Sequence, residues 1–126
     1  MIGKRVSVMI KLKAAAGLFL LLMTVTFHTT CRAGTAEEIS ALLLFVEQSE
    51  CIFVRNGNQY NGTEARRHIQ TKYDHFKEKI VTTEDFIELA ATKSIMSGKP
   101  YRVLCNGQEM NLADWLLAEL VKLRTR

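Results

Sequence analysis

Two cysteines, Cys51 and Cys105, are the sequence feature that most restricts the fold, because they lie 54 positions apart and are expected to form a disulfide. The alternative is a pair of buried, reduced thiols. A disulfide requires the two Cα atoms to approach within about 7 Å. Cys51 begins one expected strand and Cys105 ends another, so antiparallel pairing of the two strands places the cysteines opposite each other.

The disulfide prediction depends on export, which residues 1–33 indicate. A basic segment ending at Lys13 precedes an uncharged apolar run over 14–27, and Cys31-Arg32-Ala33 suits signal-peptide cleavage before Gly34. The apolar run is shorter than the roughly 20 residues of a membrane-spanning helix. We therefore expect an exported protein with no membrane span after cleavage.

Three alternatives to this leader assignment remain open. The apolar run is retained as an anchor, Cys31 is lipidated, or translation starts at Met9 rather than Met1. Cys31 leaves with the cleaved signal, so the mature chain keeps an even number of cysteines, and an oxidising compartment favours their pairing.

The positive charge of the chain belongs to the leader. The net charge is +4 in full, but residues 34–126 hold 12 basic and 13 acidic side chains, a net charge of −1. A surface that binds nucleic acid needs a concentrated cationic field, so nucleic acid is not an expected partner. The full chain is 48% hydrophobic, which excludes a disordered or fibrous protein, and its length leaves room for one globular domain over residues 34–126.

Hydrophobic periodicity indicates the order α-β-α-α-β-α without internal repeats. Helices are expected over 37–49 and 64–79, in a short segment after Thr82 and in a last segment after Asn111; strands are expected over 51–55 and 101–105. The predicted fold class is α+β and mostly helical, with four helices around a two-stranded antiparallel ribbon.

Local signals set the ends of these elements. Thr35 with Glu38 and Thr82 with Asp85 fit capping boxes, and Asn111 with Asp114 is expected to cap the last helix. The dipeptides Asn56-Gly57 and Asn106-Gly107, together with Asn61-Gly62, are expected as irregular backbone where regular structure ends.

The antiparallel register predicts a candidate anion-binding site. It pairs Phe53 with Val103 and Arg55 with Tyr101, so the end of the first strand meets the loop that enters the second. Cationic and hydroxyl side chains at such turns can hold a carboxylate or another anion. The predicted ligand-binding residues are Arg55, Asn56, His68, Lys72, Ser94, Ser97, Lys99 and Tyr101. The alternative is that these are ordinary solvated turns, with lysines that bury only their stems.

Two hypotheses from other classes compete with a non-enzymatic binder of an anionic small ligand, peptide or envelope component. One is a hydrolase with Ser94 or Ser97 as nucleophile and His68 as base. The other is an interaction module that pairs the ribbon edge with a partner strand. His68 and His75 lack carboxylate or thiolate partners at metal-ligand spacing, and no motif indicates a metal or a cofactor.

Several sequence blocks resemble a known family. Phe53-Val-Arg-Asn-Gly57, then His68 with Lys72, then Ser94-Ile-Met-Ser-Gly-Lys-Pro-Tyr101 are similar to the YfeK-like family of small exported bacterial proteins. The resemblance covers about residues 37–121. It implies a periplasmic or secreted setting in a Gram-negative bacterium, and it supplies no activity, cofactor or catalytic residue.

Overall fold

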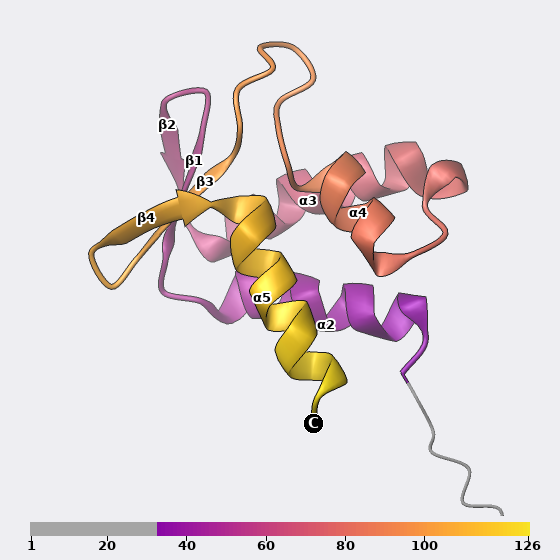
Figure 1. Cartoon of the computed structure of the whole chain (residues 1–126). Coiled ribbons are helices and arrows are strands. Elements are labelled where there is room, and N and C mark those ends of the chain that lie inside the picture. The colour runs from indigo at the N-terminus through magenta and orange to yellow at the C-terminus, as the bar shows by residue number, and fades with distance from the viewer. Residues whose placement is uncertain (1–32) are drawn as a thin grey trace, which may run out of the picture. The chain divides into compact units, whose positions relative to one another are not determined.

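The computed structural model describes residues 33–126 (Figure 1), so the expected export signal and its alternatives lie outside the described residues. The elements are α2 (Thr35–Gln48), β1 (Ile52–Arg55), β2 (Asn58–Tyr60), α3 (Gly62–Phe76), the 3₁₀ turn η1 (Lys77–Lys79), α4 (Thr83–Ala90), β3 (Arg102–Cys105), β4 (Gln108–Asn111) and α5 (Leu112–Arg124). None of the helices in this range combines the length and the apolar character needed to cross a bilayer.

The four strands form one antiparallel sheet in the order β2-β1-β3-β4. The predicted antiparallel pairing of β1 with β3 is confirmed, including the pair Phe53 and Val103. This ladder ends at Val54 and Arg102, so Arg55 and Tyr101 lie one step beyond its last pair.

The prediction of a two-stranded ribbon is wrong, because each predicted strand continues into a hairpin. Asn56-Gly57 and Asn106-Gly107 are two-residue hairpin loops with positive φ at all four residues. Paired positive φ values match the right-handed twist of the flanking strands, and Asn and Gly adopt them most readily. The outer strands β2 and β4 are short and mostly polar, which left them without a hydrophobic pattern.

The order helix–strand–strand–helix occurs twice in the described chain, contrary to the expectation of no repeats. Phe53 and Val103 each lie three positions before the Asn of their hairpin loop, and they pair with each other. Equivalent residues therefore meet at the centre of the sheet, so the two halves of the sheet are related by an approximate two-fold axis.

The core lies between the sheet and the helices. Phe53 and Val103 are 4% and 0% exposed, whereas their neighbour Ile52, on the opposite face, is 38% exposed. Trp115 of α5 packs against the core, with its ring stacked on Phe45 at 4.4 Å between centroids. Helices therefore cover one face of the sheet, as Figure 1 also shows.

One of the predicted capping boxes is correct and one is wrong. Thr82 and Asp85 form the expected reciprocal bonds at the start of α4. In α2 the residue before the helix is Gly34, without a side-chain cap, and Glu38 is buried. Its carboxylate accepts hydrogen bonds from Thr83 Oγ1 at 2.7 Å and from Arg124 Nε at 2.8 Å. Glu38 therefore links three helices rather than capping one.

Asparagines begin the two helices that follow the hairpins. Asn61 and Glu64 form a capping box at α3, where irregular backbone was expected. Asn111 occupies the cap position of α5 as expected, but its side chain makes no capping bond and its Nδ2 donates to Asp114 at 3.5 Å instead.

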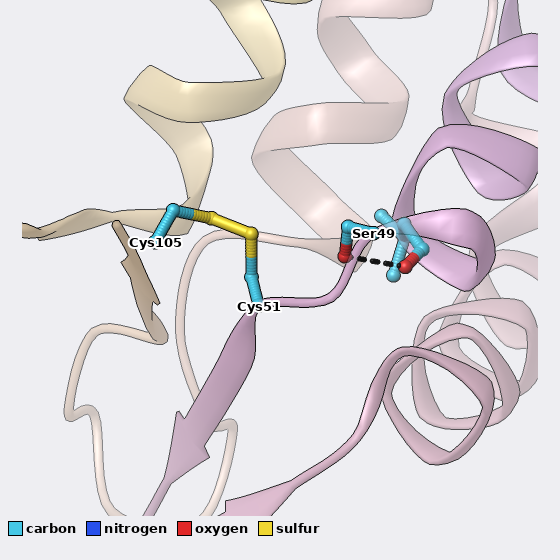
Figure 2. The surroundings of a disulfide bond; sticks show 4 residues. Ser49, Cys51 and Cys105 are labelled. Carbon is cyan, nitrogen blue, oxygen red and sulfur yellow. Dashed lines mark hydrogen bonds between the residues drawn. A yellow bond between two sulfur atoms is a disulfide. The ribbon is translucent and has the colours of Figure 1, made fainter. Parts of the chain in front are cut away.

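The predicted disulfide is confirmed (Figure 2). Cys51 and Cys105 are bonded, with their Cα atoms 4.7 Å apart. Ser49, whose hydroxyl donates to the Val46 carbonyl at 2.8 Å, ends α2 just before the chain turns toward Cys51. The disulfide thus fastens one end of the central strand pair.

Replacing both cysteines by serine (C51S/C105S) is expected to lower the free energy of unfolding by roughly 4 kcal/mol, because the unfolded chain regains the entropy of a 54-residue loop. Urea unfolding of the oxidised protein and of the variant measures the difference. A variant as stable as the oxidised protein would contradict a stabilising role for the disulfide.

Gly62→Ala is expected to destabilise the protein by about 2 kcal/mol or more, because the added methyl group would overlap packed backbone. A Cβ at Gly62 would lie 2.4 Å from the Val46 carbonyl oxygen and 2.8 Å from that of Glu47. The neighbouring exposed Thr63, changed to alanine, is the control. Equal stability of the two variants would show that α2 and α3 separate at little cost.

Candidate functional site

Arg55, at the end of β1, is the centre of the candidate site. Its Nη1 lies 3.1 Å from Nδ1 of His68 on α3, and its guanidinium carbon lies 5.8 Å from the centre of the Tyr60 ring. A guanidinium only donates hydrogen bonds, so His68 Nδ1 accepts. His68 is therefore held in the neutral form that carries its proton on Nε2.

Arg55 is partly buried without an anionic partner. Among residues 33–126 it makes no ion pair, and its Nε is buried with no hydrogen-bond partner. By contrast, Arg66, Arg102 and Arg124 each pair with a glutamate. Buried charges in proteins are normally paired, so an unpaired guanidinium indicates a site for an anion.

A small pocket opens beside this guanidinium, with a cavity volume of about 30 Å³, enough for a water-sized group. The residues that line it, which we call the Arg55 pocket, are Phe53, Val54, Arg55, Tyr60, Ala65, His68, Ile69, Tyr101, Arg102 and Leu112. The lining contains no acid. Because Arg102 pairs with Glu109 and His68 is neutral, Arg55 supplies the positive charge within mostly apolar walls.

Lys72 and Tyr101 form a second polar pair close to the pocket. The Lys72 ammonium donates to the Tyr101 hydroxyl at 3.2 Å and to the Lys93 carbonyl at 2.6 Å. Burial lowers the pKa of Lys72, and the charge of Arg55 lowers it further. Burial raises the pKa of Tyr101. Perturbed groups gathered in one place are typical of functional sites.

The loop before β3 is joined to the first hairpin through Asn56. Asn56 Nδ2 donates to the Ser94 hydroxyl at 3.3 Å, and the Ser97 hydroxyl donates to Asn56 Oδ1. The Lys99 amide donates to Ser97 Oγ at 3.2 Å. The structure thus brings together the two turns, as the register predicted. The Lys99 ammonium is exposed and makes no hydrogen bond or ion pair within the described residues.

Tyr60 is the site residue that sequence reasoning missed. It pairs with Phe53 across the first hairpin, and its ring lies 4.9 Å from the His68 ring in an edge-on contact. The signal for it was Asn56-Gly57, because a two-residue hairpin loop fixes the register that places Tyr60 on the Phe53 face.

The arrangement gives the hydrolase hypothesis no support. Both serine hydroxyls bond to Asn56 or to their own loop, and no serine–histidine hydrogen bond occurs in residues 33–126. The base position of His68, Nδ1, is occupied by the Arg55 donor. No group of three potential metal ligands is present in the same part of the chain.

The sheet edge is a weak docking template. At one edge, β2 is uncharged and its residues Asn58 and Gln59 are exposed, but the strand has three residues. At the other edge, β4 carries Glu109. Short or charged edge strands discourage pairing with a partner strand, so the interaction module stays an untested alternative.

Comparison with known proteins identifies the family. Residues 33–124 match DUF5329, a family of unknown function. The chain belongs to this family. This DUF5329 protein is also similar to the uncharacterized protein YfeK of Salmonella typhimurium, with 32% identity over 90 residues, 71% of this chain and 75% of that protein. The YfeK-like resemblance is thereby confirmed. No solved structure gives a significant match.

Stability is expected to fall as the pH decreases below about 6.5, because burial, followed by the positive charge of Arg55, lowers the pKa of folded His68. At such pH the unfolded chain binds a proton that the folded protein does not. The stabilisation that comes with neutral His68 is therefore complete above the pKa of His68 in the unfolded chain and declines below it. Urea unfolding at about pH 7.5 and about pH 5.5 should show a smaller pH effect in His68→Gln than in the wild type. The exposed His75, changed to glutamine, is the control; equal pH effects in all three proteins would contradict the prediction.

Proposed function

We propose that this DUF5329 protein is a non-enzymatic binder of an anionic ligand, which it holds at the Arg55 pocket. The observation that carries the proposal is the partly buried Arg55 guanidinium, which has no carboxylate partner and a buried Nε–H without an acceptor among the described residues. An oxygen of a carboxylate or phosphate in the pocket would accept a hydrogen bond from the guanidinium and neutralise its charge.

The size of the pocket limits how much of the ligand enters. A cavity of about 30 Å³ admits one anionic oxygen, with the rest of the ligand outside. The walls around Phe53 and Leu112 are apolar, and a charge attracts an anion more strongly in such surroundings than in water. Tyr101 accepts from Lys72 and so keeps its own hydroxyl proton for donation. The ligand classes that share this chemistry are free small anions, peptide carboxylates and phosphate-bearing envelope components.

Binding rather than catalysis fits the donor set. Arg55, Lys72 and the Nε2–H of His68 all donate hydrogen bonds, and the lining of the pocket contains no carboxylate to act as a base or nucleophile. Such a set stabilises negative charge without activating a water or a hydroxyl. The ligand is therefore expected to leave unchanged.

We place the protein in the periplasm of a Gram-negative bacterium, or secreted. The apolar leader over 14–27 supports export, and the Cys51–Cys105 disulfide is of the kind that persists in an oxidising compartment. Native mass spectrometry of the protein recovered from the periplasm tests cleavage before Gly34 and detects any retained ligand. Recovery of the uncleaved chain only from the cytoplasm would refute this location.

Arg55→Gln is expected to weaken binding of inorganic phosphate and of acetate about tenfold or more, because a charge-assisted hydrogen bond contributes about 1.5–3 kcal/mol. Amide NMR titrations of the purified wild type and variant give the affinities. The exposed Arg67 on α3, changed to glutamine, is the matched control and should bind as the wild type does.

A second variant keeps this test decisive if Arg55→Gln fails to fold. Arg55→Lys retains the charge but removes the planar fork of guanidinium donors, so it should fold and still bind less tightly. Equal affinities of the wild type and Arg55→Lys, or no shift of any pocket amide with either anion, would show that the Arg55 pocket is not an anion site.

A further inference from the structure

The loop between α4 and β3 presents two adjacent apolar side chains to solvent. Ile95 is 66% exposed and Met96 is 98% exposed. Figure 1 shows this orange segment standing away from the helices. Exposing two neighbouring apolar side chains at one tip has a cost that polar residues would avoid, so the tip is a candidate contact surface. We call residues 93–99 the tip loop.

The tip loop is closed by its own hydrogen bonds. The Ser94 amide donates to the Lys99 carbonyl at 3.0 Å, and the Gly98 amide donates to the Ser94 carbonyl at 2.9 Å. Lys93 and Pro100 form an isolated bridge at its base. The apolar side chains are therefore presented by a closed turn, which has little conformational entropy left to lose on binding.

Positive charge surrounds the apolar tip. Lys93 and Lys99 flank Ile95 and Met96 at the two ends of the loop, and both lysines are exposed. The sequence from residue 89 to residue 108 contains Lys93, Lys99 and Arg102 but no aspartate or glutamate. Any surface that receives the tip must therefore accept apolar side chains in the centre and supply negative charge around them.

We propose that the tip loop binds the surface of a bilayer that contains anionic lipids. Ile95 and Met96 enter the layer between head groups and acyl chains, and Lys93 and Lys99 contact lipid phosphates. A stable protein–protein interface buries about 800 Å² on each partner, which two protruding side chains do not supply. A bilayer surface accepts such a tip, and anionic lipids match its charge. This proposal is independent of ligand binding at the Arg55 pocket.

The experiment measures co-sedimentation with lipid vesicles of the protein as purified from the cells that produce it. The wild type should bind vesicles of phosphatidylethanolamine and phosphatidylglycerol and bind phosphatidylcholine vesicles much more weakly. The variant I95S/M96S should lose about tenfold or more in affinity, because two apolar side chains no longer leave water. Val81→Ser, at a 76% exposed valine on another segment, is the control and should bind as the wild type does.

A second readout follows the depth of the tip. Met96→Trp should show a blue shift of tryptophan fluorescence when anionic vesicles are added, whereas Val81→Trp should not. Lys93→Gln and Lys99→Gln should each weaken binding to the anionic vesicles about fivefold.

Several outcomes would overturn the proposal. One is that the wild type does not sediment with anionic vesicles, and another is that I95S/M96S binds them equally well. A third is that the wild type binds a protein partner but not vesicles, and that I95S/M96S no longer binds this partner. Phosphate binding at the Arg55 pocket should be the same in I95S/M96S and the wild type. The two proposals can therefore fail separately.

Discussion

The antiparallel pairing of β1 with β3 is the constraint on which the rest of the structure depends. It sets Phe53 against Val103 in the core, and the disulfide fastens one end of this pair. Each central strand then turns back through a tight hairpin, which widens the sheet enough for the helices to pack across one face. The same register brings Arg55 and Tyr101 close together at the end that lacks the disulfide. Fold and candidate site thus follow from a single strand pairing.

The chemistry of the Arg55 pocket arises from the way its positive charge is accommodated. His68 accepts a hydrogen bond from Arg55 in its neutral form, and the Tyr60 ring lies against the guanidinium. Both partners lower the cost of burying the cation without neutralising it. A carboxylate in either position would complete an internal ion pair, as Glu47 does for Arg66. The protein keeps a cation that a ligand can pair with.

The central features of the fold could be predicted from the sequence because they have strong local or covalent signals. Hydrophobic patterns predicted the helices together with β1 and β3, and the cysteine pair set the register in which Arg55 lies near Tyr101. The strands β2 and β4 were not predicted, because short polar strands have no hydrophobic alternation. Asn56-Gly57 and Asn106-Gly107 were the only sequence signals that indicated them. Glu38 was wrongly predicted to cap α2, because a capping box is recognised from local spacing. Its contact with Arg124 joins distant parts of the chain, and local spacing does not indicate such a contact.

The repeated hairpin relates the two ends of the central strand pair. Cys51 and Tyr101 each lie five positions before an Asn-Gly loop, and Cys105 and Arg55 each lie one position before it. The disulfide and the Arg55–Tyr101 pair therefore occupy equivalent places, as they would across the self-complementary interface of a symmetric dimer. In such a dimer both ends would need the same residues. A single chain is free of that requirement, so covalent closure at one end coexists with an open, charged counterpart at the other.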